Sequence, residues 1–229
     1  MSRMSLLEAF KSGGPVMYLL GVCSLLAVAI IVERLINLRA NRILNPVIVE
    51  RVTALAENGR ADRAIEVCHE NPGLFSNIVL AGLEIADRGE TLAKEAVEDA
   101  GRHEAPRLTR YLVSLGTVAA VAPLMGLLGT VLGMIDVFRT IAEAGAGQAE
   151  QLSGGISQAL ITTATGLLVA IPALVAHNYF HEKAEMILAD LERDSLRVLR
   201  GLYQSTRSTV LDSAVVPPAS AASVSPAGS

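Results

Sequence analysis

Three long apolar runs, separated by polar and charged stretches, set the organisation of this sequence. The uncharged parts of the runs, without Asp, Glu, Lys or Arg, are residues 15–32, 111–135 and 152–180. Each can cross a bilayer as a helix, which takes about 20 residues. No segment shows the sustained alternation of apolar and polar residues that marks a strand. The pattern predicts an all-α membrane protein with transmembrane helices at residues 15–33, 111–138 and 152–180.

The polar stretches complete this plan with long helical extensions on one side of the membrane. Apolar residues recur at helical spacing after the third run, so its helix should continue beyond the membrane. The last residues are Ser, Ala, Pro and Val without a pattern, as in disordered chains. We expect, in order, a surface segment at 1–14, a helical domain at 34–110, a short external loop at 139–151, a helix continuing over 181–204 and a disordered tail at 205–229.

Turn residues divide the helical domain into several helices. Asn58-Gly59 has the character of a helix end, because Gly or Asn often adopts the left-handed conformation there. The sequence Asn71-Pro72-Gly73 is typical of a turn. The segment between them, residues 61–70, is a short amphipathic helix. Two further helices should follow, separated at Arg88-Gly89.

Basic residues at the end of the first run indicate its orientation. Arg34, Arg39 and Arg42 follow the run directly, and arginines beside a membrane helix favour the cytoplasmic side. The run is longer than the apolar part of a signal peptide and lacks a small-residue cleavage site, so we interpret it as a retained helix. The N-terminus should therefore lie outside the cytoplasm and the C-terminus inside it.

Glycines and prolines mark the packing faces of the second and third runs. Gly129 and Gly133 form a GxxxG pair, which lets helix backbones approach closely. Pro123 should kink its helix, and the carbonyl that it frees requires a neighbouring group. Asp136 and Arg139 can pair on the helix surface. The predicted packing and kink positions are Pro123, Gly126, Gly129, Gly133, Gly166 and Pro172.

Polar side chains in the third run are the candidate functional residues, and two interpretations of them stay open. They are Ser157, Gln158, Thr162, Thr163 and Thr165. Such residues bond neighbouring helices in many membrane proteins, for about 0.6 kcal/mol each. Alternatively they line an ion pathway, since polar groups inside a span often mark one.

An ion pathway would use neutral oxygens on two helices. Gln158, Thr162 and Thr165 recur at i, i+4 and i+7 and form one stripe, while Thr163 is displaced from Thr162 by about 100°. Thr130 on the second run lies at a comparable depth. These groups can relay protons through water or coordinate sodium, but they cannot titrate. If protons move, the ionisable group should come from a partner helix.

Several other classes of function receive little support. Ser157 and His177 cannot form a hydrolase pair on one helix, because twenty residues separate them by about 30 Å. The glycines near Gly126 lack the Lys-Ser/Thr of a phosphate-binding loop. Cys68-His69 has no further metal ligands nearby, and Cys23 lies in a different setting, so neither a metal site nor a disulfide is expected. The formal net charge of −4 suggests no nucleic-acid partner, and no cofactor motif is present.

The three runs closely resemble the spans of the MotA/TolQ/ExbB proton channel family. The resemblance rests on GGPVMYLLGVCSLLAVAIIVERLINLR, APLMGLLGTVLGMIDVF and GISQALITTATGLLVAIPALVAHNYF, and it covers residues 10–205. It is nearest to the ExbB and TolQ branch, because MotA-type chains have four spans. The resemblance implies a homopentamer in the bacterial inner membrane, with the second and third spans around a central pore. The N-terminus would then be periplasmic.

The resemblance also implies partners and a mechanism. Two copies of a single-span ExbD- or TolR-like protein would sit in the pore with a membrane aspartate. Ion flow would drive rotation, and a TonB-like periplasmic protein would receive the work. A TolQ-like or gliding motor with another load, and a sodium-driven member, are alternatives. A non-conducting membrane scaffold is an alternative of another class.

By position, the resemblance assigns pore-lining roles to Thr130 and Thr163. Gln158 stands where the best-known ExbB and TolQ chains have glutamate. Glutamine keeps the size and the hydrogen-bonding capacity of glutamate but cannot titrate. The predicted ion-pathway residues are Thr130, Gln158, Thr162 and Thr163.

Overall fold

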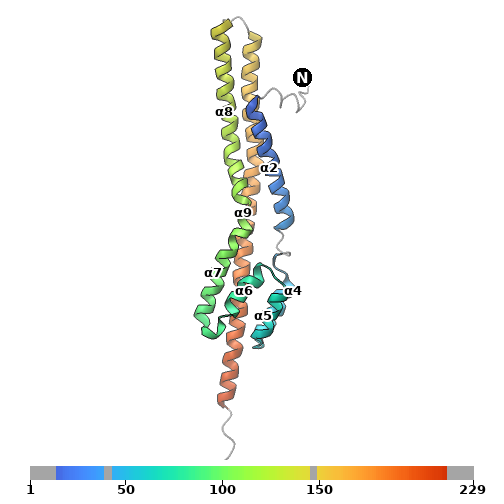
Figure 1. Ribbon diagram of the computed structural model, residues 1–229, viewed down its shortest axis with the longest axis vertical. Coiled ribbons are helices and arrows are strands. Elements are labelled where there is room, and N and C mark those ends of the chain that lie inside the picture. Colours follow the sequence, from blue (N-terminus) through green and yellow to red (C-terminus); the bar gives the residue numbers. More distant parts are fainter. Residues whose placement is uncertain (1–13, 39–42, 145–148, 216–229) are drawn as a thin grey trace, which may run out of the picture. The chain divides into compact units, whose positions relative to one another are not determined.

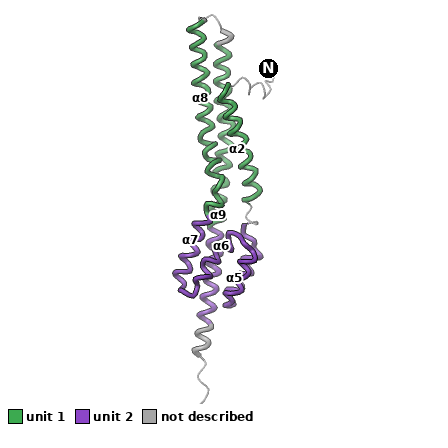
Figure 2. The backbone as a smooth tube through the Cα atoms, in the orientation of Figure 1, with its two compact units in different colours: residues 1–42, 105–188 green, residues 43–104, 189–229 purple. Residues whose placement is uncertain are grey.

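The computed structural model describes residues 14–38, 43–144 and 149–215, and these residues form helices and turns without a strand. The prediction of an all-α protein is confirmed for this part of the chain. The chain divides into two compact units (Figure 2). Unit 1 combines residues 1–42 with 105–188, and unit 2 combines residues 43–104 with 189–229.

Unit 1 contains the three apolar helices, α2 (Pro15–Asn37), α8 (Leu112–Ala144) and the first part of α9 (Ala149–Val215). Within the unit they run side by side (Figure 1). α2 begins at Pro15, a residue suited to the first turn, directly after Gly14 with a φ of 72°. Three helices are long and apolar enough to cross a membrane, as the sequence predicted.

The core of unit 1 is a contact between all three helices. Val16, Met17 and Leu20 of α2 are buried together with Ala122 of α8 and Ala170 of α9. On the outer surface, by contrast, large apolar side chains are exposed on each helix. Such a surface is costly in water and matches a hydrocarbon environment. Examples are Leu25 at 73%, Leu124 at 64% and Leu168 at 71% exposure.

The helices of unit 1 extend further than predicted at the connection between α8 and α9. α8 continues to Ala144 and α9 begins at Ala149, so most of the loop expected at 139–151 is helical. The Arg139 Nε atom lies 3.0 Å from Glu143 Oε1, a pair at i and i+4 that supports the helix. The expected pair between Asp136 and Arg139 is replaced by this one. Residues 145–148 lie outside the described part of the chain.

Unit 2 contains shorter helices and the last part of α9. They are α4 (Pro46–Glu57), α5 (Ala61–Glu70), α6 (Leu74–Leu83), the 3-10 turn η1 (Ala86–Arg88) and most of α7 (Glu90–Thr109). The three predicted breaks are confirmed, with φ of 69° at Gly59, φ of 116° at Gly89 and a bend between α5 and α6. Asn45 caps α4, because its Oδ1 accepts a hydrogen bond from the Val47 N–H at 3.1 Å.

The end of α9 is part of the core of unit 2. A methyl group at Gly82 of α6 would lie 2.6 Å from Val97 Cγ2 and 3.2 Å from Leu199 Cδ1, so three helices meet there. Most of the apolar residues expected on the inner face of this extension are buried. They are Leu191, Val198, Leu199 and Leu202 in unit 2, and Ala184 and Ile187 in unit 1.

Residues 205–215, which the sequence predicted to be disordered, are helical instead, because α9 continues to Val215. Two hydrogen bonds join this end of α9 to other residues of unit 2. The Tyr203 hydroxyl donates to the Ala86 carbonyl oxygen at 2.6 Å, and Ser205 Oγ donates to Ala56 O at 3.3 Å. Thr206 Oγ1 donates back to Leu202 O at 3.0 Å within the helix. Residues 1–13, 39–42 and 216–229, which include the surface segment, Arg39 and Arg42, lie outside the described residues.

Candidate functional site

The contact between α8 and α9 is built on glycines. A methyl group at Gly126 would lie 3.1 Å from Thr163 Cα, and one at Gly133 would lie 2.9 Å from Ala159 Cβ. At Gly166 it would lie 2.7 Å from Ala122 O. Two of these contacts are with backbone atoms, so any side chain would separate the helices.

Thr163 bonds across this interface. Its Oγ1 donates to Gly126 O on α8 at 2.9 Å, and the side chain is half-buried. The hydroxyl therefore links the two helices at the level where their backbones are closest. The hydroxyls of Thr130 and Thr165, by contrast, each donate to a carbonyl oxygen of their own helix.

Thr162 lies inside the unit. Its exposure is 0%, its Oγ1 donates to Gln158 O at 2.9 Å, and its methyl group packs against Gly129. A side chain enclosed in this way has the surroundings of a packing residue. The sequence placed Thr162 on the candidate pathway, whereas in the isolated chain it faces α8.

Thr130 is half-buried and bonds its own helix, since its Oγ1 donates to Leu127 O at 2.6 Å. It follows Gly129, which contacts Thr162, so Thr130 and Thr162 lie at one level of the bundle. The comparable depth expected of these two threonines is therefore present. Thr165 also bonds its own helix, through Ile161 O at 2.8 Å.

Gln158 lines a cavity of about 200 Å³ in unit 1. The start of α2 and one face of α8 supply the other walls, and a methyl group at Gly14 would lie 2.5 Å from Gln158 Nε2. The lining residues are Pro15, Val16, Gly129, Leu132, Gly133, Ile135, Asp136 and Gln158.

Asp136 is the residue of this cavity that sequence reasoning did not assign to it. It is three residues after Gly133 on α8 and therefore on the same face of the helix. The charge pattern suggested a surface pair with Arg139, which instead bonds Glu143. A carboxylate and a carboxamide thus share one small cavity, and both offer the oxygen ligands that hard cations prefer.

The opposite end of the bundle holds a histidine against α8. His177 Nδ1 lies 2.8 Å from Leu112 O, and the ring occupies the space left by Gly116. The sequence offered His177 only as a partner for Ser157, and the structure gives it a different neighbour. The spacing of residues within α9 could not predict its contact with Leu112, because Leu112 belongs to α8.

Pro123 and Pro172 both lie inside continuous helices. Pro123 is half-buried and Pro172 is exposed. The kink expected at Pro123 stays a prediction. Among the residues described, no group of three His, Cys, Asp or Glu side chains is arranged to hold a metal ion.

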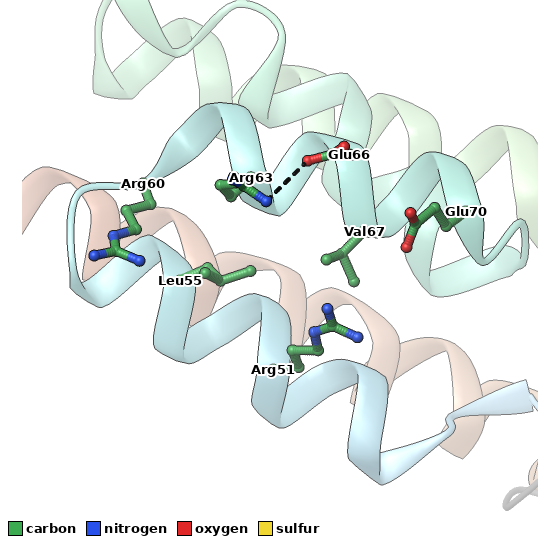
Figure 3. Close-up of a pocket in the computed structure, with 7 residues that line it drawn as sticks. All are labelled: Arg51, Leu55, Arg60, Arg63, Glu66, Val67 and Glu70. Atoms are coloured by element: carbon green, nitrogen blue, oxygen red, sulfur yellow. Dashed lines mark ion pairs between the residues drawn. The ribbon is translucent and has the colours of Figure 1, made fainter.

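Unit 2 has a separate polar cleft between α4 and α5, of about 280 Å³ (Figure 3). Arg51 comes from α4, Arg60 from the turn and Arg63 from α5. Arg63 Nη1 lies 3.7 Å from Glu66 Oε2, an exposed pair that contributes little stability. Three arginines and two glutamates line this cleft, and such a mixture of charges is typical of a solvated surface.

The sequence profile of the MotA/TolQ/ExbB proton channel family matches residues 71–193, more than half of the chain. The chain belongs to this family. The matched region includes α8 and the apolar part of α9, which form the interface described above. The resemblance seen in the sequence is therefore confirmed, and with it the interpretation as a channel-type membrane protein.

Relatives named ExbB and TolQ match over much of the chain. An ExbB-like biopolymer transport protein of Synechocystis sp. is 36% identical over 165 residues, 69% of this chain and 76% of the relative. ExbB of Xanthomonas campestris pv. campestris is 33% identical over 158 residues, 61% of this chain and 62% of the relative. TolQ of Pseudomonas aeruginosa is 34% identical over 119 residues, 52% of this chain and 47% of the relative. For the last two the match spans less than two thirds of the relative.

Proposed function

We propose that this protein is the ExbB-like subunit of an ion-driven motor in the bacterial inner membrane. Five copies would surround a pore that holds two copies of a small single-span protein similar to ExbD or TolR. The proton motive force would act through that partner to energise transport across the outer envelope, with a TonB-like protein receiving the work. The names of the relatives, ExbB and TolQ, support this class of function.

The observation that carries the proposal is the polar contact between α8 and α9, to which α9 contributes only uncharged groups, in a member of a proton-channel family. Thr163 and Gln158 present oxygen atoms in a segment without Asp, Glu, Lys or Arg. Such groups conduct protons only together with water and a titrating group. A carboxylate on a partner helix in the pore would supply that group, which is why the motor needs a second protein.

In this proposal Thr130, Gln158 and Thr163 border the route, and Thr162 holds α8 against α9. We place the protein in the membrane with Gly14 and the α8–α9 connection on the periplasmic side. Arg34 supports it, because this basic residue near the other end of α2 donates to Leu108 O at 3.0 Å and lies 5.1 Å from the Tyr111 ring centre. Basic side chains at that end favour the cytoplasm.

Two specific observations favour alternatives. The TolQ relative supports a motor with a different load. The cavity with Asp136 and Gln158 has the oxygen ligands that sodium would use, which supports a sodium-driven member. A non-conducting scaffold differs from all of these in predicting no ion flux.

Reconstitution with the small partner tests the proposal. The complex is extracted from its own cell in mild detergent, its subunits are weighed by native mass spectrometry, and ion flux is measured in vesicles under a proton or sodium gradient. We expect five copies with two of the partner and a proton flux. A monomer or dimer without partner and without flux would favour the scaffold, and flux only under a sodium gradient would favour the sodium-driven alternative.

Thr163→Val in the same vesicles tests the route, with Thr117→Val as the matched control. Both threonines bond a carbonyl oxygen of α8, but Thr117 Oγ1 donates to Val113 O in its own helix and is exposed. We expect flux to fall by about tenfold or more in Thr163→Val, a barrier change of about 1.4 kcal/mol. Normal flux in that variant would remove Thr163 from the route.

A further inference from the structure

Three titratable side chains follow one another on α9 at the Leu112 end of the bundle. They are His177, His181 and Glu185, at i, i+4 and i+8, and therefore on one face of the helix. Between Glu150 and His177 the sequence of α9 contains no Asp, Glu, His, Lys or Arg. His177 is thus the first titratable group beyond the uncharged segment.

The His177 ring is fixed against α8 by a hydrogen bond and by a glycine. A carbonyl oxygen only accepts, so Nδ1 carries the proton that it donates to Leu112 O at 2.8 Å. A methyl group at Gly116 would lie 2.9 Å from His177 Cε1 and 3.1 Å from Nδ1, so a larger residue would displace the ring. With Nδ1 occupied, Nε2 is the atom that can take up and release a proton.

The next two groups continue from this half-buried ring to solvent. The rings of His177 and His181 are parallel within 7°, and their centres are 5.9 Å apart. His181 Nε2 lies 3.4 Å from Glu185 Oε1. The side chains of His181 and Glu185 are 52% and 69% exposed. The line therefore begins against α8 and ends in solvent.

Basic groups add positive charge to the same end. On α2, Arg34 lies over the Tyr111 ring, and Arg110 lies 5.3 Å from the centre of that ring. On α9, Lys183 Nζ lies 5.7 Å from the Tyr179 ring centre. Glu33 Oε2 lies 3.2 Å from Arg34 Nε, so charged groups of both signs lie at this end of the bundle.

We propose that His177, His181 and Glu185 form the path by which protons leave the bundle at the Leu112 end. Water would deliver a proton to His177 Nε2 while the Nδ1–H bond to Leu112 stays in place. The Nε2 proton would then pass through water to His181, and from there to Glu185 or bulk solvent. Each group returns to its starting protonation state, so the path acts repeatedly. This inference rests on the proposed proton flux.

His177→Asn tests the path in vesicles that contain the full chain with its small partner. The Asn amide can occupy the place of Nδ1 and donate to Leu112 O, but it cannot titrate. We expect proton flux to fall by about 10²-fold, the lower end of the range for a positioned proton-transfer group. Its dependence on the pH at the Leu112 end should flatten between about pH 5 and 8, where histidine titrates.

His103→Asn is the matched control. His103 Nε2 lies 3.7 Å from Asp99 on α7 and its side chain is 82% exposed, so it shares the pairing with an acid four residues away. Flux in His103→Asn should equal that of the unaltered protein. The His181→Asn variant, at a side chain that is 52% exposed, should lose flux by about tenfold, and added imidazole should restore part of it.

The possible failures separate this path from the proposed function. Unchanged flux and an unchanged pH profile in an intact complex with His177→Asn would overturn the path alone. Equal proton flux in His181→Asn and His103→Asn would also overturn the path alone. Absence of proton flux in the unaltered complex would overturn the proposed function and the path with it.

Discussion

The Thr163 hydroxyl donates to the carbonyl oxygen of Gly126 at 2.9 Å, from α9 to α8. Both residues lie where a methyl group on Gly126 would meet the Thr163 backbone at 3.1 Å. The hydrogen bond and the close approach therefore depend on each other. A residue predicted to line a route also holds the two helices of that route together.

The stability of the protein should change little in Thr163→Val. Valine has the same shape, and interhelical hydrogen bonds in membranes contribute about 0.6 kcal/mol. Thermal unfolding of the protein in detergent should show a small decrease, similar to that of Thr117→Val. A large loss of stability would mean that a change in flux reports on folding and not on the route.

Gly166→Ala should destabilise the contact between α8 and α9. The added methyl group would lie 2.7 Å from Ala122 O and 3.0 Å from Gly126 Cα, and neither backbone atom can move without moving α8. Overpacking of this kind typically costs about 1–3 kcal/mol. Thermal unfolding in detergent should show a clear decrease in the midpoint.

Gly154→Ala is the control for that variant. A methyl group at Gly154 would have no atom within 4 Å, and alanine is the better helix former by about 1 kcal/mol. Its midpoint should stay equal or rise. Equal decreases in both variants would show that the close approach of Gly166 to α8 does not decide the result.

The spans and most turns could be predicted because their causes are local. Apolar length identifies α2, α8 and α9, and the left-handed conformations of Gly59 and Gly89 identify two breaks. The extension of α9 through residues 205–215 could not be predicted. At its start, Ser205 Oγ donates to Ala56 O at 3.3 Å, a contact between residues far apart in the chain that no local pattern encodes.

The candidate site was predictable in kind but not in detail. The sequence pointed to Gln158, Thr162 and Thr163 as one polar segment. Which of them faces α8 depends on the register between two helices, and that register buries Thr162 against Gly129. The same register brings Asp136 to the cavity of Gln158 and His177 to Leu112. The sequence of one helix alone cannot predict which residues of another helix it will contact.

The stability of the protein should fall as the pH rises above about 9, because of Cys68 in unit 2. Burial is the main cause that raises the pKa of this thiol from 9.0 to about 11, and a hydrogen bond with Ser76 opposes it. The folded state therefore holds the proton more tightly than the unfolded state. This contribution to stability is fully present below pH 9 and is lost as the pH rises toward 11.

Thermal unfolding in detergent between pH 8 and 11 measures this effect. Cys68→Ala should reduce the slope. Burial, followed by the charges of Glu90 and Asp87, also raises the pKa of Tyr203, so some slope should remain. An unchanged slope in Cys68→Ala would contradict the role of Cys68. Burial keeps the Cys68 thiol protonated, and the thiolate is the form that reacts with alkylating reagents. Alkylation of Cys68 should therefore require unfolding.

Ion flux should continue in Gln158→Glu and should fall in Gln158→Leu. Glutamate keeps the size and the acceptor oxygens of glutamine, so flux should continue. Leucine removes every polar atom at this position from a cavity lined partly by Gly129 and Gly133, so flux should fall by about tenfold or more, a barrier change of about 1.4 kcal/mol.

The pH dependence of Gln158→Glu adds a second readout, because Asp136 lines the same cavity. Two carboxylates in so small a space repel each other. Flux in Gln158→Glu should therefore show a pH dependence different from that of the unaltered protein. Combining it with Asp136→Asn should remove that change. If the double variant keeps the new pH dependence, Asp136 and residue 158 do not act in one cavity.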